Sequence, residues 1–443
     1  MQIPEHIFHV NDVRGLLGEV TAEVAYLSGR ALVRKTGAKT VVVGRDMRST
    51  SPLLQEEAIK GVMSLGANVI DIGLTSTSIY NFATSSLGEA EAGIMITASH
   101  NPSEYNGIKF ADSTGLPISG LDILSAIKED DGKIEVFSTV MKRDVIPVYV
   151  DACIAHMGPA DVKGMKIAVD YGNGMGALAL RPLAQKLGVE LTELYAEPDA
   201  RFPNHDANPV KRETLADLQK LMKEGGFAFG VALDGDADRI GFLDNLGEPL
   251  RGDEALALFA GDELERHPGA TIIYQPNHSW ATIKAIQDHG GRGVLRPIGR
   301  ARVVEGMRTE KARLGGEVSS HFFFIEFGGL ESVDFAFCRM LALLAKSGKS
   351  LVELASPIRA FANSWEVNFE VADKAKAVAR VEAKYAPLAT DTNRMDGIRM
   401  EFGHDWWFIL RASNTEPVLR LTVEATSKEL MEKRRDEISG LLF

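Results

Sequence analysis

A pattern that recurs three times constrains the fold more than any other feature of this chain. Each copy has an apolar run, a helical segment, a second apolar run, a further segment and a third run that ends in a polar loop. The third runs are AGIMITASHN, FAFGVALDGDADR and LGGEVSSHFF, with loops near Ser99, Asp238 and His321. Such runs are typical of α/β units with buried strands, although three unrelated α/β segments would also produce them. Because ligands gather beyond the carboxyl ends of such strands, three ends can line one cleft.

The pattern changes after about residue 360. Four strand-like runs, WEVNFEV, DGIRMEF, WWFILRA and VLRLTVEAT, occur there with two helical segments, which is typical of a small α+β domain. We therefore predict an α/β fold of three related α/β domains with mixed sheets and a smaller C-terminal α+β domain, arranged around a central cleft. The expected domains are residues 1–150, 151–252, 253–360 and 361–443.

Charge and composition disfavour several classes of function. The 61 acidic and 49 basic residues give a net charge of −12, which disfavours binding to nucleic acid. No run approaches the ~20 apolar residues of a membrane helix, and the first residues lack the pattern of a secretory signal. The only cysteines, Cys153 and Cys338, are too far apart in sequence to suggest a disulfide framework. We expect a cytoplasmic enzyme that binds neither nucleic acid nor membranes.

The segment DGDADR has the composition of a metal site. Asp234, Asp236 and Asp238 alternate, so in an extended segment their carboxylates lie on one side. Three such anions repel one another unless a cation joins them, and Mg²⁺ suits oxygen ligands. An EF-hand is excluded because Arg239 and Asn245 stand where that loop needs Gly and Glu. A solvated acidic turn is the alternative.

A second polar loop, TASHNPSEYNGIKF, spans residues 97–110. Ser99 follows an apolar run, and His100 and Lys109 are close to it in sequence. The segment lacks the G-x-S-x-G context of an α/β-hydrolase nucleophile. From these residues alone, a structural pairing of serine and histidine remains open.

The segment GNGMGA, residues 172–177, fits the G-x-G-x-x-A dinucleotide fingerprint. A tight turn between a strand and a helix explains its glycines equally well. We therefore do not expect a dinucleotide cofactor.

Four segments in chain order resemble the signature loops of the α-D-phosphohexomutase superfamily: TASHNPSEYNGIKF, DGDADR, GEVSSH and RASNTEP. The segment NDVRG, with Arg14, is similar to the N-terminal arginine motif of that family. The resemblance covers essentially the whole chain and is strongest to phosphomannomutase/phosphoglucomutase. It implies a phosphoserine-loop domain, a metal-binding domain, a sugar-binding domain and a C-terminal phosphate-binding domain, in agreement with the recurring pattern.

The resemblance implies interconversion of hexose 1-phosphate and hexose 6-phosphate, with mannose or glucose as the sugar. A phosphoserine at Ser99 and a hexose 1,6-bisphosphate, which is both intermediate and activator, are expected. One Mg²⁺ per chain is expected on Ser99, Asp234, Asp236 and Asp238. Because a phosphoserine adds close to two negative charges to this acidic site, basic residues must gather there. The expected catalytic residues are Ser99, His100, Lys109, Arg14, Arg239 and His321, although a structural role for His100 stays open.

The resemblance also implies how the substrate is held. Glu317 and Ser319 are expected to bind sugar hydroxyls, which both side chains can do. The residues expected to bind the phosphate that does not react are Arg411, Ser413, Asn414, Thr415 and Arg420. The chain departs from the family pattern at Ser320, where Gly is usual, and at Asn11, where Tyr is usual.

Other functions stay open. A phosphoglucosamine mutase is the nearest alternative, although those enzymes usually carry Gln where this chain has Val318. A non-catalytic phosphosugar-binding protein and a Mg²⁺-dependent phosphatase with Asp234 as nucleophile belong to other classes. The expected partner is a small phosphosugar, bound by a monomer or a homodimer.

Overall fold

The computed structural model describes residues 3–133, 138–412 and 418–443. The chain divides into two compact units, Met1–Arg251 with Ser319–Val352 and Gly252–Val318 with Glu353–Phe443. Among the residues described, no helix has both the length and the apolar character needed to cross a bilayer.

The first unit contains a mixed sheet with the strand order β1-β5-β4-β2-β3-β7, and β6 pairs with β5. Strands β4, β2, β3 and β7 are parallel, whereas β5 is antiparallel to both β4 and β1. The strands are β1 (Val13–Leu16), β2 (Thr40–Arg45), β3 (Asn68–Leu74), β4 (Ala92–Ile96), β5 (Tyr105–Asp112), β6 (Pro117–Ile118) and β7 (Val140–Lys142). The three apolar runs of the first predicted α/β unit form β2, β3 and β4.

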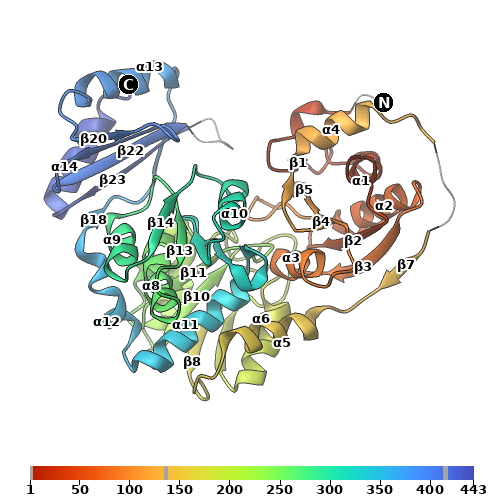
Figure 1. Cartoon of the computed structure of the whole chain (residues 1–443), viewed down its shortest axis with the longest axis horizontal. Helices are drawn as coiled ribbons and strands as arrows, with labels where there is room; N and C mark the ends of the chain where they lie inside the picture. The colour runs from red at the N-terminus through yellow and green to blue at the C-terminus, as the bar shows by residue number, and fades with distance from the viewer. Residues whose placement is uncertain (1–2, 134–137, 413–417) are drawn as a thin grey trace. The chain divides into compact units, whose positions relative to one another are not determined.

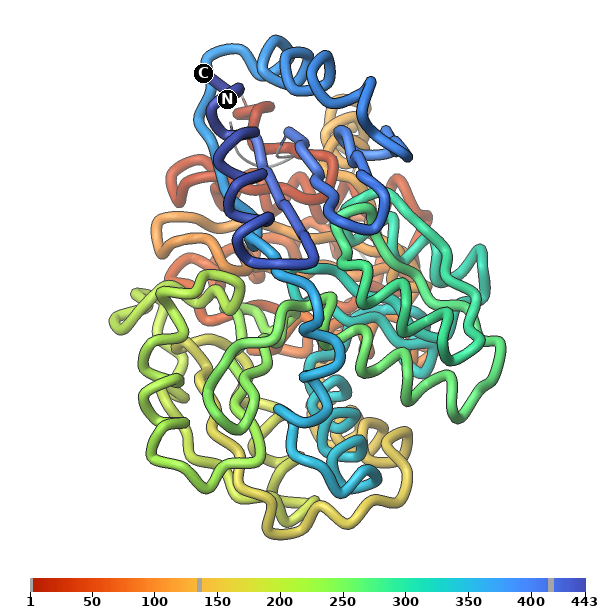
Figure 2. Tube along the Cα trace, turned by 90° about the vertical axis from the view of Figure 1, so that its left-hand side faces the viewer, coloured from red at the N-terminus to blue at the C-terminus, as the bar shows by residue number. Residues whose placement is uncertain are grey.

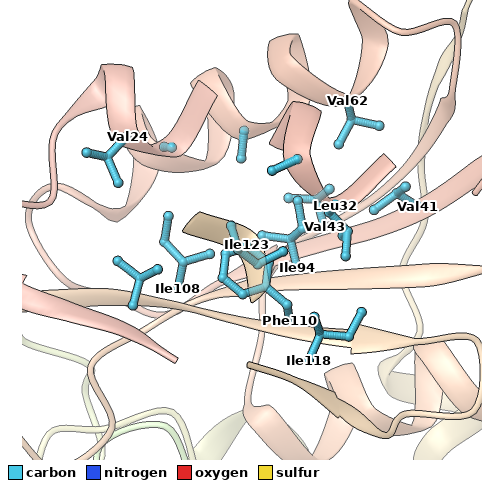
Figure 3. Close-up of a cluster of buried hydrophobic side chains, with 14 of the residues drawn as sticks. Val24, Leu32, Val41, Val43, Val62, Ile94, Ile108, Phe110, Ile118 and Ile123 are labelled. Carbon is cyan, nitrogen blue, oxygen red and sulfur yellow. The ribbon is translucent and has the colours of Figure 1, made fainter. Parts of the chain in front are cut away.

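Helices cover both faces of this sheet (Figure 1). They are α1 (Ala22–Thr36), α2 (Ser51–Met63) and α4 (Gly120–Lys128) on one face and α3 (Thr77–Ser85) on the other. Successive side chains of a strand point to opposite faces, so Val41 and Val43 of β2 pack with α1 and α2 (Figure 3). The resulting core of Val, Ile and Leu side chains holds the carboxyl ends of β2 and β4 in fixed positions.

The second sheet, also in the first unit, has the order β12-β11-β10-β8-β9. Its strands are β8 (Lys166–Asp170), β9 (Glu190–Leu194), β10 (Phe229–Leu233), β11 (Ile240–Leu243) and β12 (Pro249–Leu250). Strand β8 is parallel to β9 and β10, and β11 is antiparallel to β10 and β12. The accompanying helices are α5 (Ile146–Met157), α6 (Ala177–Leu187) and α7 (Ala216–Met222). The segment DGDADR connects β10 to β11.

The third group of strands contains β13 (Thr271–Tyr274), β14 (Arg292–Leu295) and β15 (Leu314–Gly316), which are parallel. The antiparallel pair β16 (Phe322–Phe324) and β17 (Leu330–Glu331) follows along the chain. The helices of this region are α8 (Gly252–Arg266), α9 (Trp280–Asp288), α10 (Arg300–Thr309), α11 (Val333–Ser347) and α12 (Leu351–Ala355).

The C-terminal sheet is antiparallel, with the order β18-β23-β22-β21-β20 and β19 paired with β23. Its strands are β18 (Ala362–Asn363), β19 (Val367–Phe369), β20 (Asp391–Asn393), β21 (Ile398–Phe402), β22 (Trp406–Ala412) and β23 (Leu419–Ala425). Two helices accompany it, α13 (Lys374–Tyr385) and α14 (Lys428–Ser439), and α14 packs along β23 (Figure 2). Strands and helices of this kind match the α+β pattern predicted after residue 360.

Candidate active site

Ser99 lies in the loop between β4 and β5, with only 4% of its surface exposed. Its φ of +50° is in the left-handed region, which costs a non-glycine residue of order 1 kcal/mol. Its N–H donates a hydrogen bond to Thr97 Oγ1 at 2.9 Å, and its carbonyl accepts one from Arg48 Nη2 at 2.9 Å. These bonds hold the strained backbone of the loop in place.

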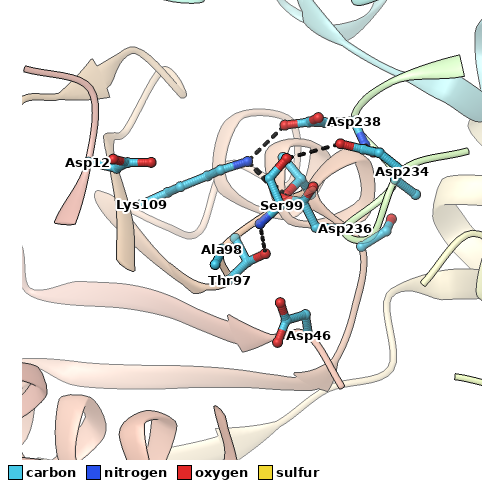
Figure 4. A network of polar contacts seen from close by, with 12 residues as sticks. Asp12, Asp46, Thr97, Ala98, Ser99, Lys109, Asp234, Asp236 and Asp238 are labelled. Atoms are coloured by element: carbon cyan, nitrogen blue, oxygen red, sulfur yellow. Dashed lines mark hydrogen bonds and ion pairs between the residues drawn. The ribbon is translucent and has the colours of Figure 1, made fainter. Parts of the chain in front are cut away.

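The DGDADR turn meets this loop although the two are far apart in sequence. Ser99 Oγ donates to Asp234 Oδ2 at 3.0 Å (Figure 4). The close approach requires a glycine at position 235, because a Cβ there would lie 2.5 Å from the Ser99 carbonyl oxygen. The other oxygen of Asp234, Oδ1, accepts from the N–H groups of Asp238 and Arg239 at 3.0 and 3.1 Å, which stabilises the turn.

The three aspartates of the turn form a buried cluster. One carboxylate oxygen of each lies within 4.8 Å of the others, and none of the three residues is more than 3% exposed. Burial and the neighbouring carboxylates of Asp238 and Asp236 raise the pKa of Asp234 well above its usual range. Oδ1 of Asp236 is buried and receives no hydrogen bond from the described residues. Such a donor set fits a hard divalent cation, which would relieve the repulsion and satisfy Oδ1.

Two predicted basic residues lie against this cluster. Lys109 Nζ is 2.7 Å from Asp236 Oδ2 and 2.8 Å from Asp238 Oδ2 (Figure 4). Burial alone would lower the pKa of Lys109, but the two carboxylates outweigh it and raise that pKa. Arg239 Nε lies 3.8 Å from Asp234 Oδ2.

Arg14, the third predicted basic residue, reaches the serine loop from β1. Its Nη1 donates to the Ala98 carbonyl at 3.0 Å and to Asn101 Oδ1 at 2.8 Å, and its Nη2 pairs with Asp12. Basic side chains therefore gather beside the acidic cluster, as the charge argument required.

The two predicted histidines also lie at this site. His100 Nδ1 is 3.2 Å from Ser99 Oγ, and burial, together with Arg239 and Arg14, lowers the pKa of His100 well below its usual value. His321 lies between two predicted site residues, with Nε2 3.2 Å from Asp238 Oδ1 and Nδ1 3.0 Å from Ser319 Oγ.

The backbone at Ser320 has the conformation that glycine, the usual residue there, adopts most readily. Its φ of +70° is in the left-handed region that favours glycine, the residue the family usually has there. The serine therefore adopts the glycine-like conformation at a cost in strain, and its carbonyl accepts a hydrogen bond from the Ile240 N–H at 3.1 Å.

The remaining predicted residues belong to the second unit. Glu317, 4% exposed, accepts a hydrogen bond from Gln275 Nε2 at 3.1 Å. Arg411 and Arg420 are cross-strand partners on β22 and β23, and each pairs with Glu366 at 3.1 Å. Two cations that share a carboxylate are able to bind a phosphate together. Ser413, Asn414 and Thr415 lie outside the described residues.

Sequence reasoning missed one residue that holds the serine loop. Arg48, 1% exposed, donates from Nη1 and Nη2 to four main-chain carbonyls, those of Ser99, Asn101, Pro102 and Tyr105. It follows β2 in the segment GRDMR, so a signal was available, namely polar residues just after a buried strand.

The middle glycine of GNGMGA, Gly174, packs against the aspartate turn. A Cβ at Gly174 would lie 2.8 Å from the Gly235 carbonyl oxygen and 2.9 Å from that of Asp234, and the Met175 N–H donates to the Gly235 carbonyl at 2.9 Å. This close contact requires a small residue at position 174, so nucleotide binding is not needed to explain the glycine.

Models of four protein domains match the chain in order. They are phosphoglucomutase/phosphomannomutase alpha/beta/alpha domains I, II and III, at residues 5–131, 147–247 and 251–361, and the C-terminal domain at residues 366–441. The predicted fold class is therefore confirmed, whereas the domain limits near residues 150, 252 and 360 stay predictions.

Known proteins resemble the chain over its full length. A phosphohexose mutase of Xanthomonas campestris is 38% identical, with 98% of both chains covered. A Pseudomonas putida phosphomannomutase/phosphoglucomutase is 34% identical, with 98% of this chain and 95% of the relative covered. The crystal structure of a phosphoglucomutase/phosphomannomutase family protein from Burkholderia thailandensis has a TM-score of 0.90 at 30% identity, with 100% of this chain and 98% of that chain covered.

Proposed function

The chain belongs to the phosphoglucomutase/phosphomannomutase family of phosphohexose mutases, and on that premise we propose that it works through a phosphoserine at Ser99. It is an isomerase that interconverts hexose phosphates. In the proposed cycle, phosphorylated Ser99 gives its phosphoryl group to the free hydroxyl of a hexose 1- or 6-phosphate. The resulting hexose 1,6-bisphosphate turns end for end, and Ser99 takes back the other phosphoryl group.

One observation carries this proposal. The Ser99 hydroxyl is 3.0 Å from Asp234 Oδ2, in a cluster of three buried aspartates. A phosphoserine beside three carboxylates is destabilised by repulsion between like charges unless a cation is present. We propose that Ser99, Asp234, Asp236 and Asp238 hold one Mg²⁺, which when bound neutralises negative charge on the transferred phosphoryl group.

The basic residues have distinct proposed tasks. Arg14 and Arg239 offset the charge of the incoming phosphosugar, which reaches a site already rich in carboxylates. Lys109 and His321, which both contact Asp238, are proposed to move the proton that the attacking hydroxyl loses. His100 contacts Ser99 Oγ at 3.2 Å and is proposed to orient it.

Two further groups are proposed to position the substrate. Glu317 and Ser319 bind two sugar hydroxyls, and Arg411 with Arg420 binds the phosphate that does not react. Glucose and mannose differ only at C2. Binding of the sugar 3- and 4-hydroxyls by Glu317 and Ser319 therefore does not distinguish these two substrates. We therefore propose activity on both sugars.

The test is Ser99→Ala, with Ser103→Ala of the same loop as its control. We expect Ser99→Ala to lose mutase activity by at least about a thousandfold and to carry no phosphoryl group by intact mass. Ser103→Ala should keep mutase activity and the phosphoryl group, because the Ser103 hydroxyl contacts Glu104 rather than the aspartate turn. A Ser99→Ala enzyme that still hydrolyses sugar phosphates would instead support a phosphatase with Asp234 as nucleophile.

Substrate choice is tested with the 1-phosphates of mannose, glucose and glucosamine. We expect turnover of the first two. Turnover of the glucosamine compound alone would identify a phosphoglucosamine mutase. Binding without turnover of any of them, with bisphosphate supplied, would identify a phosphosugar-binding protein.

A further inference from the structure

We infer that Thr77, at the start of α3, is a positioning residue that orients Asp236 for the metal ion. The inference rests on the proposed metal site and assigns a role to a residue outside the four signature loops. Thr77 lies 159 residues from Asp236 in sequence, yet its Oγ1 donates a hydrogen bond to Asp236 Oδ2 at 2.6 Å.

The start of α3 holds the aspartate turn at three points. Besides the side-chain bond, the Thr77 N–H donates to the Asp236 carbonyl at 2.8 Å, and Ser78 Oγ donates to the Ala237 carbonyl at 2.9 Å. The first N–H groups of a helix have no partner within the helix, so they are available to bind an adjacent loop. Ala237 has a φ of +52°, and these bonds stabilise that strained backbone.

The two carboxylate oxygens of Asp236 differ in their hydrogen-bond partners. Oδ2 accepts from Thr77 Oγ1 and from Lys109 Nζ at 2.7 Å, whereas Oδ1 is buried and has no hydrogen-bond partner in the part of the chain that is described. A buried carboxylate oxygen without a donor is costly, and a cation removes that cost. Oδ1 is therefore the oxygen that would be left to hold a metal ion, and Thr77 helps to keep the carboxylate from rotating.

Outer groups that orient a metal ligand typically change metal affinity by about 10- to 100-fold when they are removed. Thr77→Val keeps the shape of the side chain and removes its hydroxyl, which donates to Asp236 Oδ2 and accepts from Lys109 Nζ at 3.5 Å. Thr77→Ser keeps the hydroxyl. Thr84→Val is the matched control, because Thr84 is a buried threonine of the same helix whose hydroxyl donates to the Tyr80 carbonyl, at 2.9 Å, rather than to the aspartate turn.

The experiment is calorimetric titration of the dephosphorylated protein with Mg²⁺, without substrate, alongside turnover at increasing Mg²⁺ concentration. We expect Thr77→Val to raise the Kd for Mg²⁺ by about 10- to 100-fold, with Thr77→Ser within about threefold of wild type and Thr84→Val unchanged. Turnover of Thr77→Val should return toward the wild-type rate as Mg²⁺ saturates, because the lost group acts through the ion.

The inference is overturned by equal Mg²⁺ affinity in Thr77→Val and wild type, or by an equal loss in Thr84→Val. If Thr77→Val does not fold, Thr77→Ala replaces it under the same criteria. A wild-type protein that binds no Mg²⁺ or turns over no hexose phosphate would refute the proposed function itself. The wild-type titration and turnover therefore test the proposed function, and the comparison of variants tests the role of Thr77.

Discussion

Arg48→Lys is the perturbation that best tests how the serine loop is held. The guanidinium reaches four main-chain carbonyls, with donor–acceptor distances of 2.5 to 2.9 Å, and is 1% exposed. A lysine has three donors on one atom and cannot reproduce the planar fork, so at least one buried carbonyl loses its partner. At about 1–3 kcal/mol for each unsatisfied group, loss of one or two partners destabilises the protein by about 1–6 kcal/mol.

The same change should slow turnover. The Ser99 carbonyl is one of the four acceptors, so relaxation of the loop moves the hydroxyl away from Asp234, and misplacement by about 1 Å costs about 100-fold in rate. Arg30→Lys is the matched control, because Arg30 is 2% exposed and bonds Asp130, Ser64 and the Lys133 carbonyl, away from the serine loop.

The assay combines urea unfolding with steady-state kinetics on hexose 1-phosphate. Both variants should lose stability, but only Arg48→Lys should lose kcat, by about 100-fold. An unchanged kcat in Arg48→Lys would refute the reasoning. An equal loss of kcat in Arg30→Lys would show that general destabilisation, rather than the serine loop, is responsible.

Three other changes have expected outcomes. Gly235→Ala places a Cβ 2.5 Å from the Ser99 carbonyl oxygen, so it should separate the two loops and lower both kcat and Mg²⁺ affinity in a titration. Burial raises the pKa of Asp334 to about 7, so between pH 4 and 7 the native state keeps a proton that the unfolded state releases. Wild type should therefore lose up to about 4 kcal/mol of stability as the pH rises over that range. Thermal melts of Asp334→Asn should lack this loss. Glu366→Gln removes a carboxylate that would compete for Arg411 with the phosphate that we propose it binds, so the KM for hexose 1-phosphate should fall by about two- to fivefold. A rise in KM would contradict this.

The sequence predicted the elements that depend on local pattern. The apolar runs of β2, β4 and β10 and the polar residues that follow them were visible because strand periodicity and buried runs are properties of neighbouring residues. The resemblance of four ordered loops then predicted that Ser99 and Asp234 would meet, and they do, at 3.0 Å. The roles of the individual site residues remain proposals.

The partners of Arg48 and Thr77 could not be predicted in the same way. Ser76 caps α3 by accepting a hydrogen bond from the Ile79 N–H, an interaction between residues close in sequence. Nothing local indicates that the next residue, Thr77, donates to a carboxylate 159 positions away.

The sequence by itself determined the chemical character of the site, since the aspartates, the serine and the basic residues occur in short segments at strand ends. Only the tertiary structure decided which oxygen of Asp236 is left for a cation and which residues hold the two loops. The physical reason is that hydrogen bonds act over about 3 Å, so their partners are set by the packing of helices and sheets rather than by spacing along the chain.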